Sequence, residues 1–318
     1  MKEFYINDLK KDMEVIDFFM VKSINVKTGS NGKNYLDILL GDKTGEISSK
    51  KWDLTDQEIE YLNTVEIGFP VKVRAIVTEW NGTKQFRIMR IRKANENDDI
   101  DIVEFVKAAP EASEDMYDYI YARTEDFKDD DLKKLAQKML KDNKEKLMYY
   151  PAAQKNHHAE LGGLLYHTKR MLMTGERICE VYKCLDKDLL LTGVIIHDME
   201  KINEIESNRL GISPGYSFEG KLLGHIVQGV KTIDRIAAEL GLPREKAIML
   251  EHMVLSHHYE PEYGSPKRPM FPEAEILHYL DIIDARMYDM EEALSGTEPG
   301  GFSERVFTLE GRQIYKRK

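Results

Sequence analysis

The stretch GVIIHDMEKI, residues 193–202, places a histidine and an aspartate directly after an apolar run that belongs in a protein core. Leu190 and Val194 precede His197 and Asp198 by helical steps, so this pair is expected on the buried side of a helix. Burying two titratable groups is costly unless each has a polar partner. The stretch therefore predicts a helical core that contains a polar site.

The other histidines follow the same pattern. All nine lie between His157 and His278, in sequence that has the apolar periodicity of successive helices. One inward stripe holds His225 with Leu222 and Ile233, and Asp281 falls at the helical spacing of buried neighbours. The predicted inward polar residues are His167, His197, Asp198, His225, His257, His258 and Asp281.

A shared metal centre would explain this set. Taken singly, each residue is more typical of a hydrogen-bonded core position, but five imidazoles and two carboxylates would each need a separate partner. Imidazole and carboxylate together suit Mn, Fe, Zn or Ni, and Asp198 could bridge two ions. Two such ions stabilise both the attacking and the leaving oxygen of a phosphoryl displacement. Phosphate-ester hydrolysis is therefore the chemistry we expect, and the chain has neither a GxxxxGK[ST] nor an HExxH stretch that would favour another one.

Residues 13–93 are typical of a small β-barrel. Short strand patterns alternate with turn signals, among them Gly41 to Gly45 and the pair Asn81-Gly82. Five strands with a short helix before the fourth suit an OB-fold, which often binds single-stranded nucleic acid. Tyr35, Trp52 and Phe86 are candidates for stacking on bases, with core packing as the alternative for each ring.

Charge and composition complete the outline. The chain of 318 residues has a formal net charge of −10, and residues 94–131 hold 14 acidic against 3 basic side chains, typical of a solvated face. Neither a signal peptide nor an apolar stretch of membrane-spanning length is evident, so we expect a cytoplasmic protein with no membrane partner. We predict a multidomain α and β protein, with an all-α domain after the barrel. Its predicted segments are an OB-fold at 1–95, an acidic linker and first helix at 96–130, a helical metal-dependent phosphohydrolase domain at 131–295 and an extension at 296–318.

Three long motifs add a family resemblance. The order of the inward histidines and aspartates resembles that of the HD-domain metal-dependent phosphohydrolases, which are all-helical. HHAELGGLLYHT, LSHHYEPEYGSPKRP and EAEILHYLDIIDARM, together with an OB-like N-terminus, more closely resemble the YhaM-type 3′-to-5′ exoribonucleases of Gram-positive bacteria. The resemblance covers nearly the whole chain.

The resemblance implies removal of nucleoside 5′-monophosphates from the 3′ end of single-stranded RNA, and of DNA as an alternative. It also implies two divalent ions, most often Mn with Mg, Fe, Co or Ni as alternatives, and a homo-oligomer. One ion would be held by His167, His197, Asp198 and Asp281, and the other by Asp198, His225, His257 and His258.

Further roles follow from the same motifs. Asp198 and Lys201 would be catalytic, with Lys201 facing the scissile phosphate, although Glu200 stands where the HDxGK motif has glycine. Lys267 and Arg268 are expected to bind phosphate or to be solvated loop charges. His157 and His158, at the start of the helix with His167, either line the same cavity or are structural, and Asp284 is expected to orient a ligand.

Two alternatives remain open on the sequence. An HD phosphohydrolase acting on free nucleotides or cyclic dinucleotides would use the same ligands and differ only in substrate. A noncatalytic RNA-binding protein would not need the full ligand set.

Overall fold

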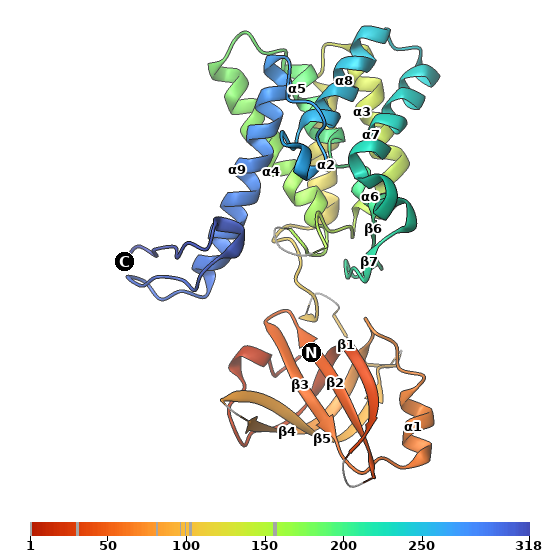
Figure 1. Ribbon diagram of the computed structural model, residues 1–318, viewed down its shortest axis with the longest axis vertical. Coiled ribbons are helices and arrows are strands. Elements are labelled where there is room, and N and C mark those ends of the chain that lie inside the picture. Colours follow the sequence, from red (N-terminus) through yellow and green to blue (C-terminus); the bar gives the residue numbers. More distant parts are fainter. Residues whose placement is uncertain are drawn as a thin grey trace. The chain divides into compact units, whose positions relative to one another are not determined.

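The computed structural model describes residues 2–29, 32–80, 82–95, 97–98, 100–101, 104–154 and 158–318. The chain forms two compact units, Met1–Ala108 and Ala109–Lys318. The first is a β-barrel and the second is helical, as Figure 1 shows. This confirms the predicted fold class. None of the helices in the described ranges is long and apolar enough to cross a membrane.

The barrel is closed, with strand order β1-β2-β3-β5-β4 and a parallel pairing of β3 with β5. A short helix precedes the fourth strand, as predicted for an OB-fold. The elements are β1 (Glu14–Thr28), β2 (Asn34–Asp42), β3 (Gly45–Lys51), α1 (Asp56–Leu62), β4 (Pro70–Trp80) and β5 (Thr83–Lys93), after a 3-10 turn at Ile6–Asp8.

Local sequence explains these elements. In β4, Val71, Val73 and Ala75 are buried and alternate with the more exposed Lys72 and Arg74, which is the period-two pattern of a strand with one buried face. Helix α1 begins at a capping box in which Thr55 and Glu58 each bond to the other's backbone N–H. The predicted turn between Gly41 and Gly45 joins β2 to β3, whereas Asn81 lies outside the described residues.

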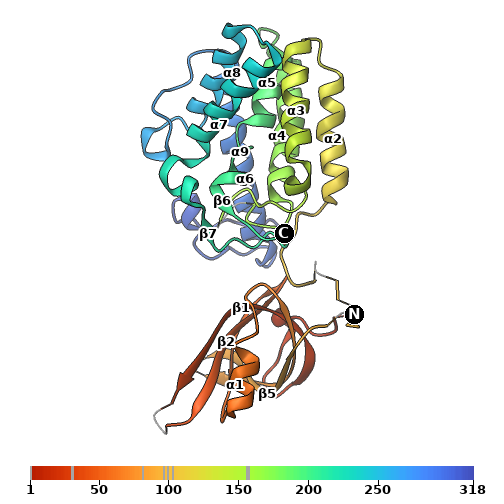
Figure 2. The ribbon, with the colours of Figure 1, turned by 90° about the vertical axis from the view of Figure 1, so that its right-hand side faces the viewer.

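The helices of the second unit form where the sequence has apolar periodicity. Figure 2 shows β6 and β7 beside the short helix α6. Helix α2 begins at Ser113, and Ala112 is its N-cap residue. The elements are α2 (Ser113–Glu125), α3 (Asp130–Leu147), α4 (Gly163–Val181), α5 (Lys187–Ile196), α6 (Lys201–Glu204), β6 (Ile205–Glu206), β7 (Gly215–Tyr216), α7 (Phe218–Leu240), α8 (Arg244–Ser256), a 3-10 turn (Pro261–Tyr263), α9 (Pro272–Ser295) and a 3-10 turn (Phe307–Leu309).

Helix α5 lies at the centre of this unit. From Leu189 to Ile196 every residue is buried, and Asp186 caps the helix by accepting a hydrogen bond from the Leu189 N–H. A Cβ at Gly193 would collide with the side chain of Met253, so glycine lets α5 and α8 pack closely. The helix thereby delivers its C-terminal end, and the residues that follow, into the middle of the bundle.

One predicted stripe is wrong at its first residue. Leu222 is 67% exposed, although His225 and Ile233 are buried. The physical reason is a break in α7 at Gly224, where φ is 67° and ψ is 167°. The turn before this break therefore faces a different direction from the helix after it.

The C-terminal segment folds back on its own helix. Residues Phe302 and Tyr315 form an isolated antiparallel bridge, and Arg286 of α9 makes two bonds to the Glu310 carboxylate, at 2.8 and 2.9 Å. Leu309 is fully buried. The segment thus contacts the helical unit directly.

Candidate metal centre and nucleic-acid interface

The His-Asp pair of the opening stretch lies at the end of α5. His197 is the C-cap residue and is fully buried, and Asp198 is 2% exposed in the turn that follows. His197 Nδ1 lies 2.9 Å from the Val194 carbonyl oxygen. Because that oxygen can only accept, Nδ1 donates and the Nε2 lone pair is left to face inward.

The four other imidazoles are oriented in the same way. Each has an acceptor beside Nδ1, so each presents Nε2 as a potential ligand. The Nδ1 partners are Asp284 Oδ2 for His167 at 2.8 Å, Glu204 Oε2 for His225 at 2.9 Å, the Val254 carbonyl for His257 at 2.7 Å and the Tyr263 carbonyl for His258 at 2.6 Å.

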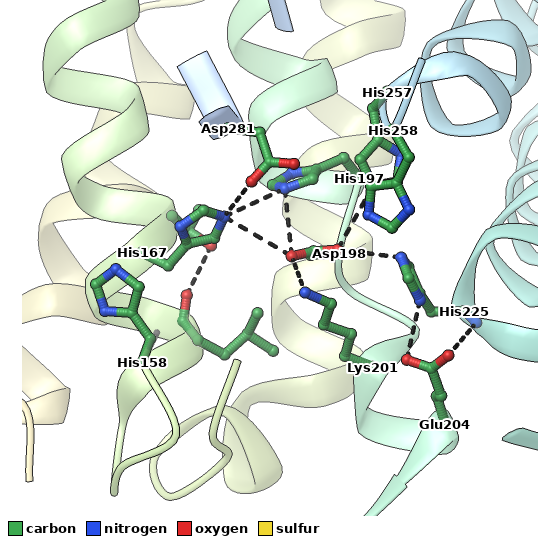
Figure 3. Close-up of polar contacts among 12 residues, drawn as sticks. His158, His167, His197, Asp198, Lys201, Glu204, His225, His257, His258 and Asp281 are labelled. Carbon is green, nitrogen blue, oxygen red and sulfur yellow. Dashed lines mark hydrogen bonds and ion pairs between the residues drawn. The ribbon is translucent and has the colours of Figure 1, made fainter. Parts of the chain in front are cut away.

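Asp198 lies between two sets of these ligands, as Figure 3 shows. Its Oδ2 is 3.7 Å from His167 Nε2 and 3.4 Å from His197 Nε2, and His167 Nε2 is 3.5 Å from Asp281 Oδ1. We refer to His167, His197, Asp281 and this oxygen as the Oδ2 group.

The other carboxylate oxygen faces the second set. Asp198 Oδ1 is 3.4 Å from His225 Nε2 and 3.8 Å from His257 Nε2, and His258 completes a set whose ligand atoms all lie within 4.8 Å of one another. We refer to these three histidines and Oδ1 as the Oδ1 group. The structure thus brings together all seven residues that the sequence singled out as metal ligands.

Unpaired atoms at this point fit a divalent cation. Asp198 Oδ1, His225 Nε2 and His257 Nε2 are buried and have no hydrogen-bond partner among the described residues. Each unpaired buried polar atom costs about 1–3 kcal/mol, a cost that a shared cation would remove. Imidazole nitrogens with carboxylate oxygens are a donor set suited to Mn, Fe, Zn or Ni.

The electrostatics keep Asp198 and His257 in the form that binds metal. Burial alone would raise the pKa of Asp198, but Lys201 and His197 outweigh it and hold that pKa well below its usual range. Burial lowers the pKa of His257 well below its ordinary value, and the neighbouring His258 adds to this effect. The carboxylate is therefore ionised and the imidazole of His257 neutral near pH 7.

The barrel has an exposed aromatic and basic face. Tyr35 and Trp52 stack with ring centroids 4.7 Å apart, and Lys50 Nζ lies 5.8 Å from the Trp52 ring centre. Trp52 is 50% exposed and Trp80, which the sequence prediction did not include, is 69% exposed. A pocket of about 500 Å³ on this face is lined in part by Lys50, Trp52, Trp80 and Arg87.

Phe86 was predicted to stack on bases, and that prediction is wrong. It borders the same pocket, but only 1% of the residue is exposed and its ring packs edge-on against Phe19 at 5.2 Å. Its position in β5 points it into the barrel core, where no base can reach it. The alternative of core packing is correct for this residue.

Comparison with known proteins assigns a family to part of the helical unit. Residues 164–286 match the family model of the HD domain. The helical unit carries an HD domain. This domain indicates a metal-dependent phosphohydrolase and spans all seven converging residues.

Similar solved structures match parts of this chain. One is the second OB-fold domain of replication protein A from Methanococcus maripaludis, with 15% identity over 31% of this chain and 98% of that chain and a TM-score of 0.23. Another is the single-stranded DNA binding protein from Thermus aquaticus, with 10% identity over 28% of this chain and a TM-score of 0.24. The match spans 43% of that second protein.

The HD motif here is HDMEK, and the backbone at its fourth position, Glu200, does not require glycine. Glu200 has φ −78° and ψ 0°, an ordinary helical conformation, and its carboxylate accepts a hydrogen bond from Asn203 Nδ2 at 2.6 Å. Lys201 begins α6, and its Nζ lies 2.7 Å from Asp198 Oδ2. The local turn thus places Lys201 beside Asp198 with Glu200 in the motif.

His158, which was expected either to line the cavity and contact substrate or to be structural, is a buried residue that no substrate can reach. It precedes α4, is fully buried and lies 2.7 Å from Asp284 Oδ2 through Nε2. Burial would lower the pKa of His158, but the nearby carboxylates of Asp284 and Glu160 outweigh this and raise it. The ring packs behind His167, and its neighbour His157 lies outside the described residues.

Two outer carboxylates hold two of the five converging histidines. Asp284, which the sequence suggested, accepts bonds from His158 and His167 and pairs with Arg170 at 2.6 Å. Glu204, which it did not suggest, bonds to His225. Nothing in the apolar periodicity marks Glu204, because it lies on a four-residue helix.

The remaining predicted contacts lie on the surface. Lys267 and Arg268 are exposed in the loop after His258, and Arg268 stacks over the ring of Tyr259 at 4.9 Å. Arg268 also lies 3.5 Å from Glu260. Both side chains are accessible to solvent, and their role in phosphate binding stays a prediction.

Proposed function

We propose that this protein is a 3′-to-5′ exoribonuclease that uses divalent ions, Mn²⁺ above all, to release nucleoside 5′-monophosphates from single-stranded RNA. The observation that carries the proposal is the position of Asp198. Its two oxygens face separate groups of imidazole Nε2 atoms, which supports two ions in one site. A pair of ions is suited to displacement at phosphorus.

The ions would supply Lewis-acid stabilisation of the phosphate and a nucleophilic water at neutral pH. The ammonium group of Lys201, beside Asp198 Oδ2, would neutralise an oxygen of the scissile phosphate. A water oxygen forms a bond to phosphorus, the bond to the 3′-oxygen of the penultimate nucleotide breaks, and that oxygen takes up a proton. Lys267 and Arg268 would hold phosphates of the incoming strand.

The barrel supports a strand as the substrate rather than a free nucleotide. Tyr35, Trp52 and Trp80 offer rings to successive bases, and Lys50 and Arg87 lie close enough to attract phosphates. An enzyme for free nucleotides or cyclic dinucleotides would not require such a face.

The test uses oligoribonucleotides labelled at either end, incubated with the full chain and Mn²⁺. We expect immediate release of a labelled mononucleotide from the 3′ label and a ladder of shortening products from the 5′ label. The same assay with a DNA oligonucleotide measures the preference for RNA.

The matched control is Asp198→Ala, which should be inactive in every arm. Hydrolysis of nucleoside triphosphates or cyclic dinucleotides, with intact oligonucleotides, would overturn the proposal in favour of a nucleotide phosphohydrolase. Mononucleotide release from the 5′ label first would overturn the direction of attack.

A further inference from the structure

The two groups around Asp198 differ in what already contacts the shared carboxylate. Lys201 Nζ lies 2.7 Å from Asp198 Oδ2, and its side chain is only 15% exposed. The Lys201 N–H also donates to the Asp198 carbonyl at 3.0 Å, which fixes the lysine next to this aspartate. An ion bound by the Oδ2 group therefore shares its oxygen with an ammonium group, or displaces it.

Among the residues that the structure describes, the Oδ1 group has no such competitor. Asp198 Oδ1, His225 Nε2 and His257 Nε2 are all without a hydrogen-bond partner among the residues described. A cation bound there breaks no existing bond and satisfies three buried atoms at once. This difference favours the Oδ1 group.

The carboxylates behind the histidines also differ. Asp284 accepts from His167 but pairs as well with His158 and Arg170, so its negative charge is divided among several donors. Among the described residues, both hydrogen bonds to the Glu204 carboxylate come from His225, one from Nδ1 at 2.9 Å and one from the backbone N–H at 3.2 Å. A carboxylate committed to one imidazole makes that imidazole the stronger ligand.

The second carboxylate of the Oδ2 group does not reverse this order. Asp281 adds one negative charge to that group, but Lys201 adds one positive charge at close range. With these charges offset, the groups differ in their neutral donors. The Oδ1 group has three imidazoles and the Oδ2 group has two.

We propose that the two halves of the site fill in order, with the Oδ1 group binding a divalent ion more tightly than the Oδ2 group because Lys201 weakens the latter. The proposal rests on the proposed metal centre. It assigns Lys201 a second role besides phosphate contact, which is to set the affinity of the second ion.

The test is a titration of the metal-free full chain with Mn²⁺. Calorimetry measures the binding affinities, and electron paramagnetic resonance detects the bound Mn²⁺. The wild type should show two binding events, with the signal of an isolated ion at half an equivalent. His225→Asn should remove the tighter event. Asp281→Asn should remove the weaker event and leave the tighter one unchanged.

Lys201→Met should strengthen the weaker event by about tenfold or more, the effect of removing a unit charge at short range. Lys201→Gln repeats the test should the methionine variant fail to fold. Lys183→Met removes an exposed charge of the same unit and should alter neither event.

Three outcomes would overturn the inference. The tighter event could be lost in Asp281→Asn and kept in His225→Asn, which reverses the order. The events could have equal affinity with no change in Lys201→Met, which removes the proposed role of the lysine. Absence of Mn²⁺ binding in the wild type would refute the metal centre itself, whereas ordered binding without nuclease activity would refute only the proposed function.

Discussion

The break in α7 at Gly224 gives the sharpest test of how the metal-facing histidines are held. Gly224 has φ 67° and ψ 167°, a conformation that residues with a side chain rarely adopt. This break turns the next residue so that the His225 N–H reaches Glu204 Oε1 at 3.2 Å while its Nδ1 reaches Oε2 at 2.9 Å. We expect Gly224→Ala to disturb both bonds.

The size of the effect follows from the space around the residue. A Cβ at Gly224 would have its nearest neighbour, Glu204 Oε1, at 3.5 Å, which is ordinary van der Waals contact. The cost is therefore conformational, about 1–3 kcal/mol of the free energy of unfolding. If the backbone relaxes toward a continuous helix instead, His225 loses its carboxylate partner, and Mn²⁺ affinity of the Oδ1 group falls by about 10- to 100-fold.

Gly241→Ala, at the C-cap of the same helix, is the matched control. Gly241 ends α7 in the left-handed conformation with φ 71°, and a Cβ there would meet nothing within 4 Å. This variant should lose about 1–2 kcal/mol of stability in urea unfolding and keep wild-type Mn²⁺ affinity. Wild-type Mn²⁺ affinity in Gly224→Ala, measured by calorimetry, would refute the role of this break in orienting His225.

Four further substitutions test the catalytic centre, the barrel and the Glu200 turn. Asp198→Ala should abolish hydrolysis in a gel assay and leave the Kd for an oligonucleotide, measured by fluorescence anisotropy, nearly unchanged; retained Mn²⁺-dependent cleavage would defeat the site assignment. Trp52→Ala should raise that Kd by about 5- to 150-fold, since stacking on a base contributes about 1–3 kcal/mol. Phe86→Ala should instead lower the free energy of unfolding, measured in urea, by about 3–5 kcal/mol. Glu200→Gly should lose the bond to Asn203 and about 1 kcal/mol of stability without raising kcat; a higher kcat would show that glycine places Lys201 better.

Periodicity predicted the ligands because they follow the same rule as the core. His167 lies on α4 among buried residues, and Asp281 lies one turn before the buried Asp284 on α9. A polar residue on an apolar helical face is visible in the sequence without knowledge of the partner helix. The alternating valines of β4 made the barrel strands visible for the same reason.

The same rule fails where the backbone departs from regular geometry. Leu222 was placed on the inward stripe because the pattern assumes a continuous helix, and the single unusual φ of Gly224 removes it. Glu204 is 21 residues from His225 along the chain, and its contact depends on how α6 meets α7. Neither feature has a periodic signal.

Exposure on the barrel was the least predictable property. Trp52, Trp80 and Phe86 are all aromatic residues near basic ones, yet two are half exposed or more and one is in the core. Side chains alternate between the two faces of β5, and Phe86 is at a position whose side chain points inward, next to Phe19. Residue type and neighbouring charge do not reveal which face of the strand a side chain occupies, because that depends on the register of the closed sheet.

Glu200 shows how a departure from a family motif can be neutral for the backbone. A glycine is required only where φ is positive or a side chain would collide, and at Glu200 φ is −78°. The buried carboxylate instead bonds to Asn203 within the turn that contains Lys201. Lys201 Nζ reaches Asp198 Oδ2 at 2.7 Å with Glu200 in the motif, so glycine is not needed to place the lysine. The Glu200 side chain adds a hydrogen bond to a turn that glycine would leave held by backbone bonds alone.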